Sequence, residues 1–256
     1  MRHNATSPPS VAERVLDLLG AFSTDRRALS LSELSRRAGL PLSTAHRLVG
    51  ELAKRGALER DGDGRYRVGL WLWEVAALAP RGTGLRENAM PFLEDLYEAT
   101  HENVQLAVLD GAEVVYLERI SGRAAVNVVS RVGGRLPAHA TGVGLALLAH
   151  SPTVAETVLA EPLKRFTDKT IGTGEHLRRT LATVRRDGFA ISDGQIELIA
   201  LSVAAPVFGA DGEVAAAISI VVPSENADPL ALVPAVRAAA RGISRALGAP
   251  LSSPLP

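Results

Sequence analysis

The chain contains no cysteine, and only 4% of its 256 residues are aromatic. Without cysteine it can form neither disulfides nor thiolate metal sites, and a cytoplasmic location is expected. No apolar run is long enough to span a membrane, because Gly, Ser or charged residues interrupt each such stretch within about 12 residues. The first ten residues, MRHNATSPPS, lack the apolar core of a signal peptide. We therefore expect a disordered leader at residues 1–8 and a short tail at 251–256.

The chain also lacks a net charge, since it has 28 basic and 28 acidic residues. These charges are unevenly distributed. Residues 1–70 contain 12 basic and 8 acidic residues, which leaves 16 basic and 20 acidic residues for the remainder. A basic front and an acidic back indicate that only the front meets a polyanion. With 46% hydrophobic residues, the chain can build one large core or two smaller ones.

The front of the chain has the pattern of three short helices. The apolar spacing of a first amphipathic helix is carried by Val11, Val15, Leu18, Leu19 and Phe22. Ser30 and Glu33 have the S-x-x-E spacing of a capping box, which predicts the start of a second helix. That helix buries Leu31, Leu34 and Ala38 and ends at Gly39. Pro41 prevents it from continuing.

A third helix is predicted over residues 42–55, with Ala45, Leu48, Val49 and Leu52 buried. Two short alternating runs follow, separated by Asp-Gly-Asp-Gly at 61–64, and these predict a β-hairpin. This order of elements is the winged helix-turn-helix pattern, which we place at residues 9–68.

The third helix begins with polar side chains on its outward face. Ser43, His46 and Arg47 are of the types that contact base edges, while Thr44 and the helix N-terminus suit a phosphate. In the hairpin, the residues predicted to flank the minor groove or backbone are Arg60, Arg65 and Arg67. Two alternatives stay open: an ordinary solvated helix face, or a winged domain that binds a protein.

A linker helix is predicted at residues 69–84, with Leu70, Trp73, Ala77 and Leu78 on one side. Trp71 and Trp73 are interpreted as packing anchors. The pattern of residues 85–250 then predicts an α+β sensor-like domain with a mainly antiparallel sheet, of the kind that often forms one wall of a ligand pocket. Its predicted helices cover 85–100, 141–150, 152–160, 176–187 and 229–247, with Thr141 as an N-cap. Its predicted strands cover 104–110, 114–120, 124–133, 188–194, 200–208 and 213–223.

No catalytic set is recognisable, and we predict that the chain is not an enzyme. Gly142 and Gly144 lack the third glycine of a dinucleotide fingerprint, because Leu147 stands there. The six histidines include no H-E-x-x-H motif, so neither a metal nor another cofactor is expected. No serine lies in G-x-S-x-G. His139 is either a structural hydrogen-bonding residue or a ligand contact.

Several segments together resemble the IclR family of bacterial transcriptional regulators. They include LSLSELSRRAGLPLSTAHRLVGELAKRGALER, SRVGGRLPAHATGVGLALLA and SVAAPVFGADGEVAAAISI, and the resemblance extends from about residue 11 to 247. It implies a winged helix, a linker helix and a C-terminal GAF-like α/β effector domain. It further implies a homodimer that pairs into a homotetramer, a double-stranded operator, a small-molecule effector, commonly an organic acid, and control of metabolic or catabolic genes.

The resemblance also implies an effector site. The backbone N–H groups of Gly142 and Val143 would hold a carboxylate. The other positions implied are Val128, Leu136, Ser192, Ser202, Ser219 and Val221.

The chain departs from the family pattern at Ile199, where family members usually have Gly, and at Val221, where some have Ser. Both changes add apolar volume, so we hypothesise an effector with one carboxylate and an apolar or aromatic body. The alternative for Ile199 is simple core packing. An enzyme that uses the C-terminal pocket and a protein-interaction adaptor are the rival functions.

Overall fold

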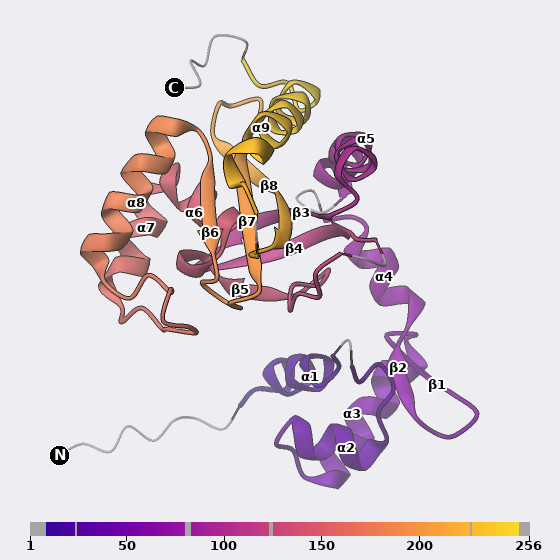
Figure 1. Cartoon of the computed structure of the whole chain (residues 1–256). Helices are drawn as coiled ribbons and strands as arrows, with labels where there is room; N and C mark the ends of the chain where they lie inside the picture. The colour runs from indigo at the N-terminus through magenta and orange to yellow at the C-terminus, as the bar shows by residue number, and fades with distance from the viewer. Residues whose placement is uncertain (1–8, 24, 80–82, 123–124, 226, 251–256) are drawn as a thin grey trace, which may run out of the picture. The chain divides into compact units, whose positions relative to one another are not determined.

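The computed structural model describes residues 9–23, 25–79, 83–122, 125–225 and 227–250. The leader and the tail expected from the sequence lie outside these residues. The chain divides into two compact units, residues 1–82 and 83–256, and Figure 1 shows the elements of each. The two units are described separately.

The first unit is a three-helix domain with a hairpin. It consists of α1 (Val11–Gly20), α2 (Leu31–Arg37), α3 (Leu42–Lys54), β1 (Leu58–Arg60) and β2 (Tyr66–Val68). The two strands pair antiparallel, with Glu59 opposite Arg67. A short helix, α4 (Leu70–Ala76), follows the hairpin. This order confirms the winged helix-turn-helix prediction.

Local signals determine where these helices begin and end. The capping box of α2 is present: the Glu33 N–H donates to Ser30 Oγ at 3.3 Å, and the Ser30 N–H donates to Glu33 Oε2 at 2.8 Å. Beyond the end of α2, Gly39 has a φ of +65°, which favours glycine. A second capping box, between Ser10 and Glu13, starts α1. This second capping box was not predicted from the sequence.

The core of the first unit is built from residues of all three helices. Its buried members are Leu18, Ala21, Leu29, Leu34, Ala45, Leu48, Val49 and Leu58. Leu52 packs against this core but is only partly buried. The prediction for Val11 was wrong, because its side chain is 56% exposed. Val11 is the first residue of α1, so it extends past the edge of the small core.

The predicted linker helix is shorter than the sequence suggested, since α4 ends at Ala76. Its apolar side chains remain exposed: 46% for Trp71, 67% for Trp73 and 80% for Leu78, which follows the helix. The interpretation of both tryptophans as packing anchors is therefore wrong within this chain. They form an exposed apolar surface.

The second unit is a six-stranded antiparallel sheet covered by helices. Its strands are β3 (Asn103–Asp110), β4 (Glu113–Ile120), β5 (Arg135–Pro137), β6 (Ala190–Asp193), β7 (Ala200–Phe208) and β8 (Val214–Pro223). Their order across the sheet is β5-β4-β3-β8-β7-β6. The helices are α5 (Thr83–Thr100), α6 (Gly142–Ala149), α7 (Pro152–Ala160), α8 (Gly174–Asp187) and α9 (Pro229–Ala246).

Each face of the sheet has its own core, as Figure 1 shows for the helices on either side. Ala204 and Ala217 face α6, α7 and α8, whereas Val203 and Ile218 face α5 and α9. Because side chains of a strand alternate between faces, β7 and β8 are apolar at nearly every position. Buried on both faces, the sheet gives its strands a fixed register.

One predicted strand is absent. Of residues 124–133, those from 125 onward form no strand, and β5 begins only at Arg135. The segment is held instead by side chains. Asn103 Nδ2 donates to the Val126 carbonyl at 2.8 Å, and Arg119 Nη1 donates to the Ser130 carbonyl at 2.9 Å. We call residues 125–134 the strap.

Among the described residues, no single helix is long and apolar enough to cross a membrane. Only α6 and α7 taken together pass that test, and they are bent by 118° at the break between them. All residues of α6 are buried inside the second unit, which accounts for their apolar composition.

Candidate functional site

The start of α3 presents a polar surface. Ser43, His46 and Arg47 are exposed and Thr44 is partly buried, whereas Ala45, Leu48 and Val49 lie in the core. This separation arises because residues three and four apart share one helix face. Pro41 stands at the N-cap and provides no side-chain hydrogen bond. The first N–H groups of α3 are therefore available to an anion.

The hairpin of β1 and β2, residues 58–68, is the wing. Its three arginines have different surroundings. Arg67 is exposed, and it forms no hydrogen bond or ion pair with another residue that the structure describes. Arg60 is also exposed, but its Nε donates to the Gly64 carbonyl at 3.3 Å and its guanidinium lies 5.7 Å from the centre of the Tyr66 ring.

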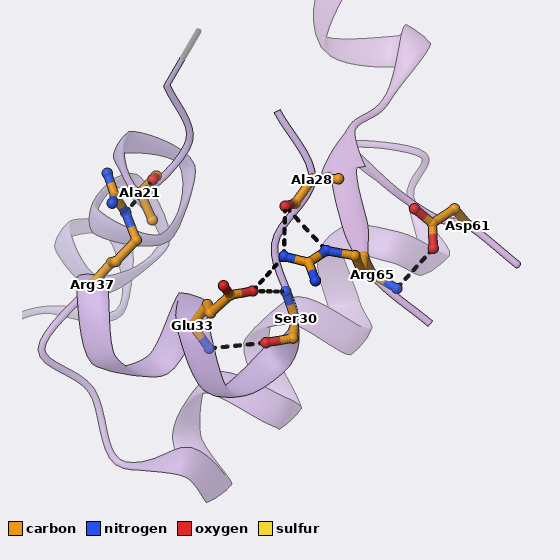
Figure 2. A network of polar contacts seen from close by, with 7 residues as sticks. All are labelled: Ala21, Ala28, Ser30, Glu33, Arg37, Asp61 and Arg65. Atoms are coloured by element: carbon orange, nitrogen blue, oxygen red, sulfur yellow. Dashed lines mark hydrogen bonds and ion pairs between the residues drawn. The ribbon is translucent and has the colours of Figure 1, made fainter. Parts of the chain in front are cut away.

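Arg65 is used inside the unit (Figure 2). Its Nε and Nη2 donate to the Ala28 carbonyl at 3.3 and 3.2 Å, and Nη2 also donates to Glu33 Oε2 at 2.8 Å. A guanidinium held by three hydrogen bonds is committed to fixing the wing against α2. The spacing of the arginines in the sequence could not show that Arg65 has a different role from Arg60 and Arg67.

In the second unit, a cavity of about 60 Å³ lies between the sheet, the start of α6, the strap and the segment 192–197. Its lining residues are Gln105, Tyr116, Val128, Val129, Ser130, Leu136, Ala140, Thr141, Gly142, Val143, Ser192, Gln195, Ile196, Glu197, Ala200, Ser202 and Val221. A cavity with mainly apolar walls and a few polar groups suits a small organic ligand.

The N-terminus of α6 supplies backbone donors to this cavity. Thr141 is the N-cap, as predicted, and its Oγ1 accepts the Gly144 N–H at 3.2 Å. The N–H groups of Gly142 and Val143 make no hydrogen bond with the described residues. Two adjacent N–H groups at a helix start are well placed to bind a carboxylate.

The two glycines of α6 allow the helix to lie directly on its neighbours. A Cβ at Gly142 would be 2.6 Å from Ser202 Oγ, and one at Gly144 would be 2.1 Å from the Ala138 carbonyl oxygen. Both distances are too short for non-bonded atoms. The Gly142-Val143-Gly144 sequence is thus explained by close packing of α6, and no dinucleotide site is needed.

Polar groups on the sheet side complete the cavity. The buried Gln105 side chain donates from Nε2 to Ser130 Oγ at 2.7 Å, which holds the strap against β3. Burial raises the pKa of the Tyr116 hydroxyl, so this group stays protonated at physiological pH. No hydrogen bond to that hydroxyl is found among the described residues. Tyr116 can therefore donate to a ligand.

Most residues implied for the effector site do meet around this cavity. Those that line it are Val128, Leu136, Gly142, Val143, Ser192, Ser202 and Val221. Ser219 does not; it is fully buried one row deeper in the sheet, opposite Gln105 and Ala204, and its Oγ has no partner among the described atoms. A role of Ser219 in effector binding therefore stays a prediction.

Both interpretations of Ile199 were wrong. Its side chain is 58% exposed, so it is not core, and it does not line the cavity. The apolar character of the site is therefore due to Val221, which does line the cavity, and to the surrounding valines and Leu136.

Sequence reasoning missed several lining residues. The clearest are Gln105, Tyr116, Ser130, Gln195 and Glu197. They come from β3, β4, the strap and the segment before β7, and no local spacing connects them. Thr141 was recognised only as a helix cap, although it also forms part of the wall.

His139 has a structural role. It is buried outside the cavity lining, and its Nε2 lies 3.0 Å from the Lys164 carbonyl oxygen. Within the described part of the chain, no cluster of three or more His, Asp or Glu side chains could hold a metal ion.

Comparisons with known proteins match this two-part arrangement. The model of the IclR helix-turn-helix domain matches residues 11–62, and that of the bacterial transcriptional regulator IclR C-terminal domain matches residues 78–245. The HTH-type transcriptional regulator XynR of Escherichia coli is 32% identical over 93% of this chain and 97% of its own. The transcriptional repressor IclR of the same organism is 30% identical over 84% and 81%.

Solved structures agree. An IclR homolog from Microbacterium hydrocarbonoxydans, crystallised with 4-hydroxybenzoate, is 44% identical, with a TM-score of 0.88 over 93% of this chain and 99% of its own. An IclR-type regulator from Silicibacter is 30% identical, with a TM-score of 0.80 over 96% and 100%. The surface of α3, the wing and the cavity are thus parts of a DNA-binding transcriptional regulator with an effector domain, and not of an enzyme: the chain belongs to the IclR family.

Proposed function

We propose that this protein is a ligand-responsive, sequence-specific regulator of metabolic or catabolic genes, whose effector is a small organic acid. The observation that carries the DNA-binding part is the polar, uncapped start of α3, with Ser43, His46 and Arg47 exposed above a buried apolar face. The operator is double-stranded DNA, and the protein acts in the cytoplasm.

On the DNA, Arg47, Ser43 and His46 contact base edges in the major groove. Thr44 and the first N–H groups of α3 bind a phosphate. Arg60 and Arg67 bind the backbone or minor groove, since both are exposed on the wing. Arg65 contributes by holding the wing in place.

The effector places its carboxylate on the N–H groups of Gly142 and Val143. Its body lies against Val128, Leu136 and Val221, so an apolar or aromatic ligand with one carboxylate fits best. The relative crystallised with 4-hydroxybenzoate supports an aromatic carboxylate, because it is 44% identical over nearly the whole chain. Binding should change DNA affinity by a coupling of about 1–3 kcal/mol.

The protein acts as a homodimer that pairs into a homotetramer. The exposed apolar side chains of Leu70, Trp73 and Leu78 support pairing of two copies along the linker, because water contact with such side chains is unfavourable. Light scattering of the wild type and of Trp73→Glu measures this directly. A monomeric wild type would contradict the proposal.

The first test is fluorescence anisotropy of the purified protein on the DNA beside its own gene, with unrelated DNA as competitor and a salt series. We expect competitor-resistant binding that weakens by about 0.9 log units per neutralised phosphate for each log unit of salt. An aromatic carboxylate should then shift the affinity. Binding no better than to unrelated DNA, together with an empty genome-wide pull-down, would favour a protein-interaction adaptor.

A further inference from the structure

One side chain in the cavity differs in charge from all the others. Glu197 is the only acidic residue among the described lining residues, and none of them is Arg, Lys or His. Its Oε2 accepts the Val129 N–H at 3.0 Å, which connects the strap to the segment before β7. Its second oxygen has no hydrogen bond to the described residues. Glu197 therefore contributes a negative charge and an unused acceptor.

Glu197 lies away from the carboxylate-binding end of the cavity. Gly142 contacts β7 at Ser202, as the 2.6 Å distance from a Cβ at Gly142 to Ser202 Oγ shows. Glu197 adjoins Ala200, whose N–H donates to the Glu197 carbonyl at 3.1 Å. Ser202 and Ala200 are two positions apart in β7, a spacing of about 6.6 Å along the strand. A benzene ring with substituents in para positions extends over such a distance.

We propose that Glu197 determines specificity: it selects effectors with a hydrogen-bond donor opposite the carboxylate and rejects those with a second carboxylate. The inference rests on the proposed effector site. A hydroxyl or amino group at the far end donates to the free oxygen of Glu197, in a hydrogen bond strengthened by the charge. A second carboxylate there meets a like charge with no cation among the described lining residues to offset it.

Other lining groups complete the ligand site. The Tyr116 hydroxyl, which stays protonated, can donate a hydrogen bond to an oxygen of the ligand. Val128 and Val221 form apolar walls around the middle of the ligand. The effector class is thus a hydroxy- or amino-substituted aromatic monocarboxylate.

The test compares the wild type with Glu197→Gln by calorimetry. Glutamine keeps a carbonyl oxygen for the Val129 N–H and removes only the charge, so the strap remains held. The probes are benzoate, 4-hydroxybenzoate and benzene-1,4-dicarboxylate. Glu161→Gln is the matched control, because Glu161 is exposed and outside the cavity lining.

In the wild type and in Glu161→Gln, we expect 4-hydroxybenzoate to bind about tenfold or more tightly than benzoate, and the dicarboxylate to bind weakest. In Glu197→Gln, the dicarboxylate should gain about tenfold or more while benzoate changes little. Equal gains for all three probes, or an unchanged ranking in Glu197→Gln, would overturn the role of Glu197. If no probe binds any variant while DNA binding is intact, the aromatic-carboxylate effector itself is wrong, and the selection by Glu197 with it.

Discussion

Glu33 and Arg65 form an ion pair of 2.8 Å between Nη2 and Oε2, and the same Oε2 accepts the Ser30 N–H that starts α2 (Figure 2). One carboxylate oxygen thus joins the cap of a helix to the wing, two segments separated by 32 residues. These hydrogen bonds lower the pKa of Glu33, with the Ser30 N–H as the largest cause. The orientation of the wing therefore depends on Glu33, whose position is fixed by the capping box with Ser30.

Replacing Arg65 should have a different effect from replacing Arg67. Arg65→Ala removes the hydrogen bonds to Ala28 and Glu33, so we expect a melting temperature lower by several degrees and weaker DNA binding. Arg67→Ala should leave the melting temperature unchanged and reduce the salt slope of DNA binding by about 1. Differential scanning fluorimetry and anisotropy measure the two quantities. Equal thermal effects in both variants would contradict the distinction.

Arg47→Ala should weaken operator binding by about 1–3 kcal/mol and relax the base preference at one position. The reason is that Arg47 is exposed at the start of α3, where a guanidinium can donate two hydrogen bonds to guanine. Anisotropy with a set of single-base operator variants measures both effects. Uniform weakening on all sequences would assign Arg47 to the phosphates instead.

Gly142→Ala should weaken effector binding about tenfold or more, equal to 1.4 kcal/mol, with DNA binding preserved. The added Cβ would be 2.6 Å from Ser202 Oγ and would displace the N–H groups that we propose bind the carboxylate. Ser202→Ala removes that oxygen and leaves Cβ atoms at 3.2 Å. The double variant should accordingly regain part of the affinity by calorimetry. No recovery would mean that the contact with Ser202 is not the cause.

His150 should make stability depend on pH. Burial and the nearby Arg185 lower its pKa in the folded protein. Above the ordinary histidine pKa of about 6.5, both states are neutral and His150 contributes nothing. As the pH falls below that value, the unfolded state binds a proton first, so stability decreases. We expect the melting temperature of His150→Leu to fall less than that of the wild type between pH 7.5 and 5. Parallel curves would contradict this.

Much of the fold could be predicted because its signals are local. Each of these signals sets the start, end or turn of an element only a few residues away. They are the Ser30–Glu33 capping box, Gly39 after α2, the turns at Asp110-Gly111 and Asp211-Gly212, and the Thr141 cap. The strap could not be predicted, since its alternating valines suit a strand. Its conformation is fixed by side chains distant in sequence, namely Asn103, Gln105 and Arg119.

The candidate site was predicted in part for the same reason. Gly142 and Val143 follow a recognisable cap, whereas Tyr116 and Glu197 reach the cavity only through the strand order of the sheet. For Ile199, comparison of one position with the family pattern did not predict where the side chain lies. A large apolar residue in a turn can remain exposed to solvent without touching either core or ligand.

Successive side chains of β8 point to opposite faces of the sheet, so the cavity wall and the core on the other face can change independently. Val221 touches the cavity, while its neighbours Ile220 and Val222 pack against the layer of α5 and α9. A substitution at Val221 would thus reshape the proposed effector site without disturbing the core on the opposite face of the sheet. If the cavity binds the effector, few mutations on this face suffice to change the ligand range, and the same positions offer a starting point for designing biosensors.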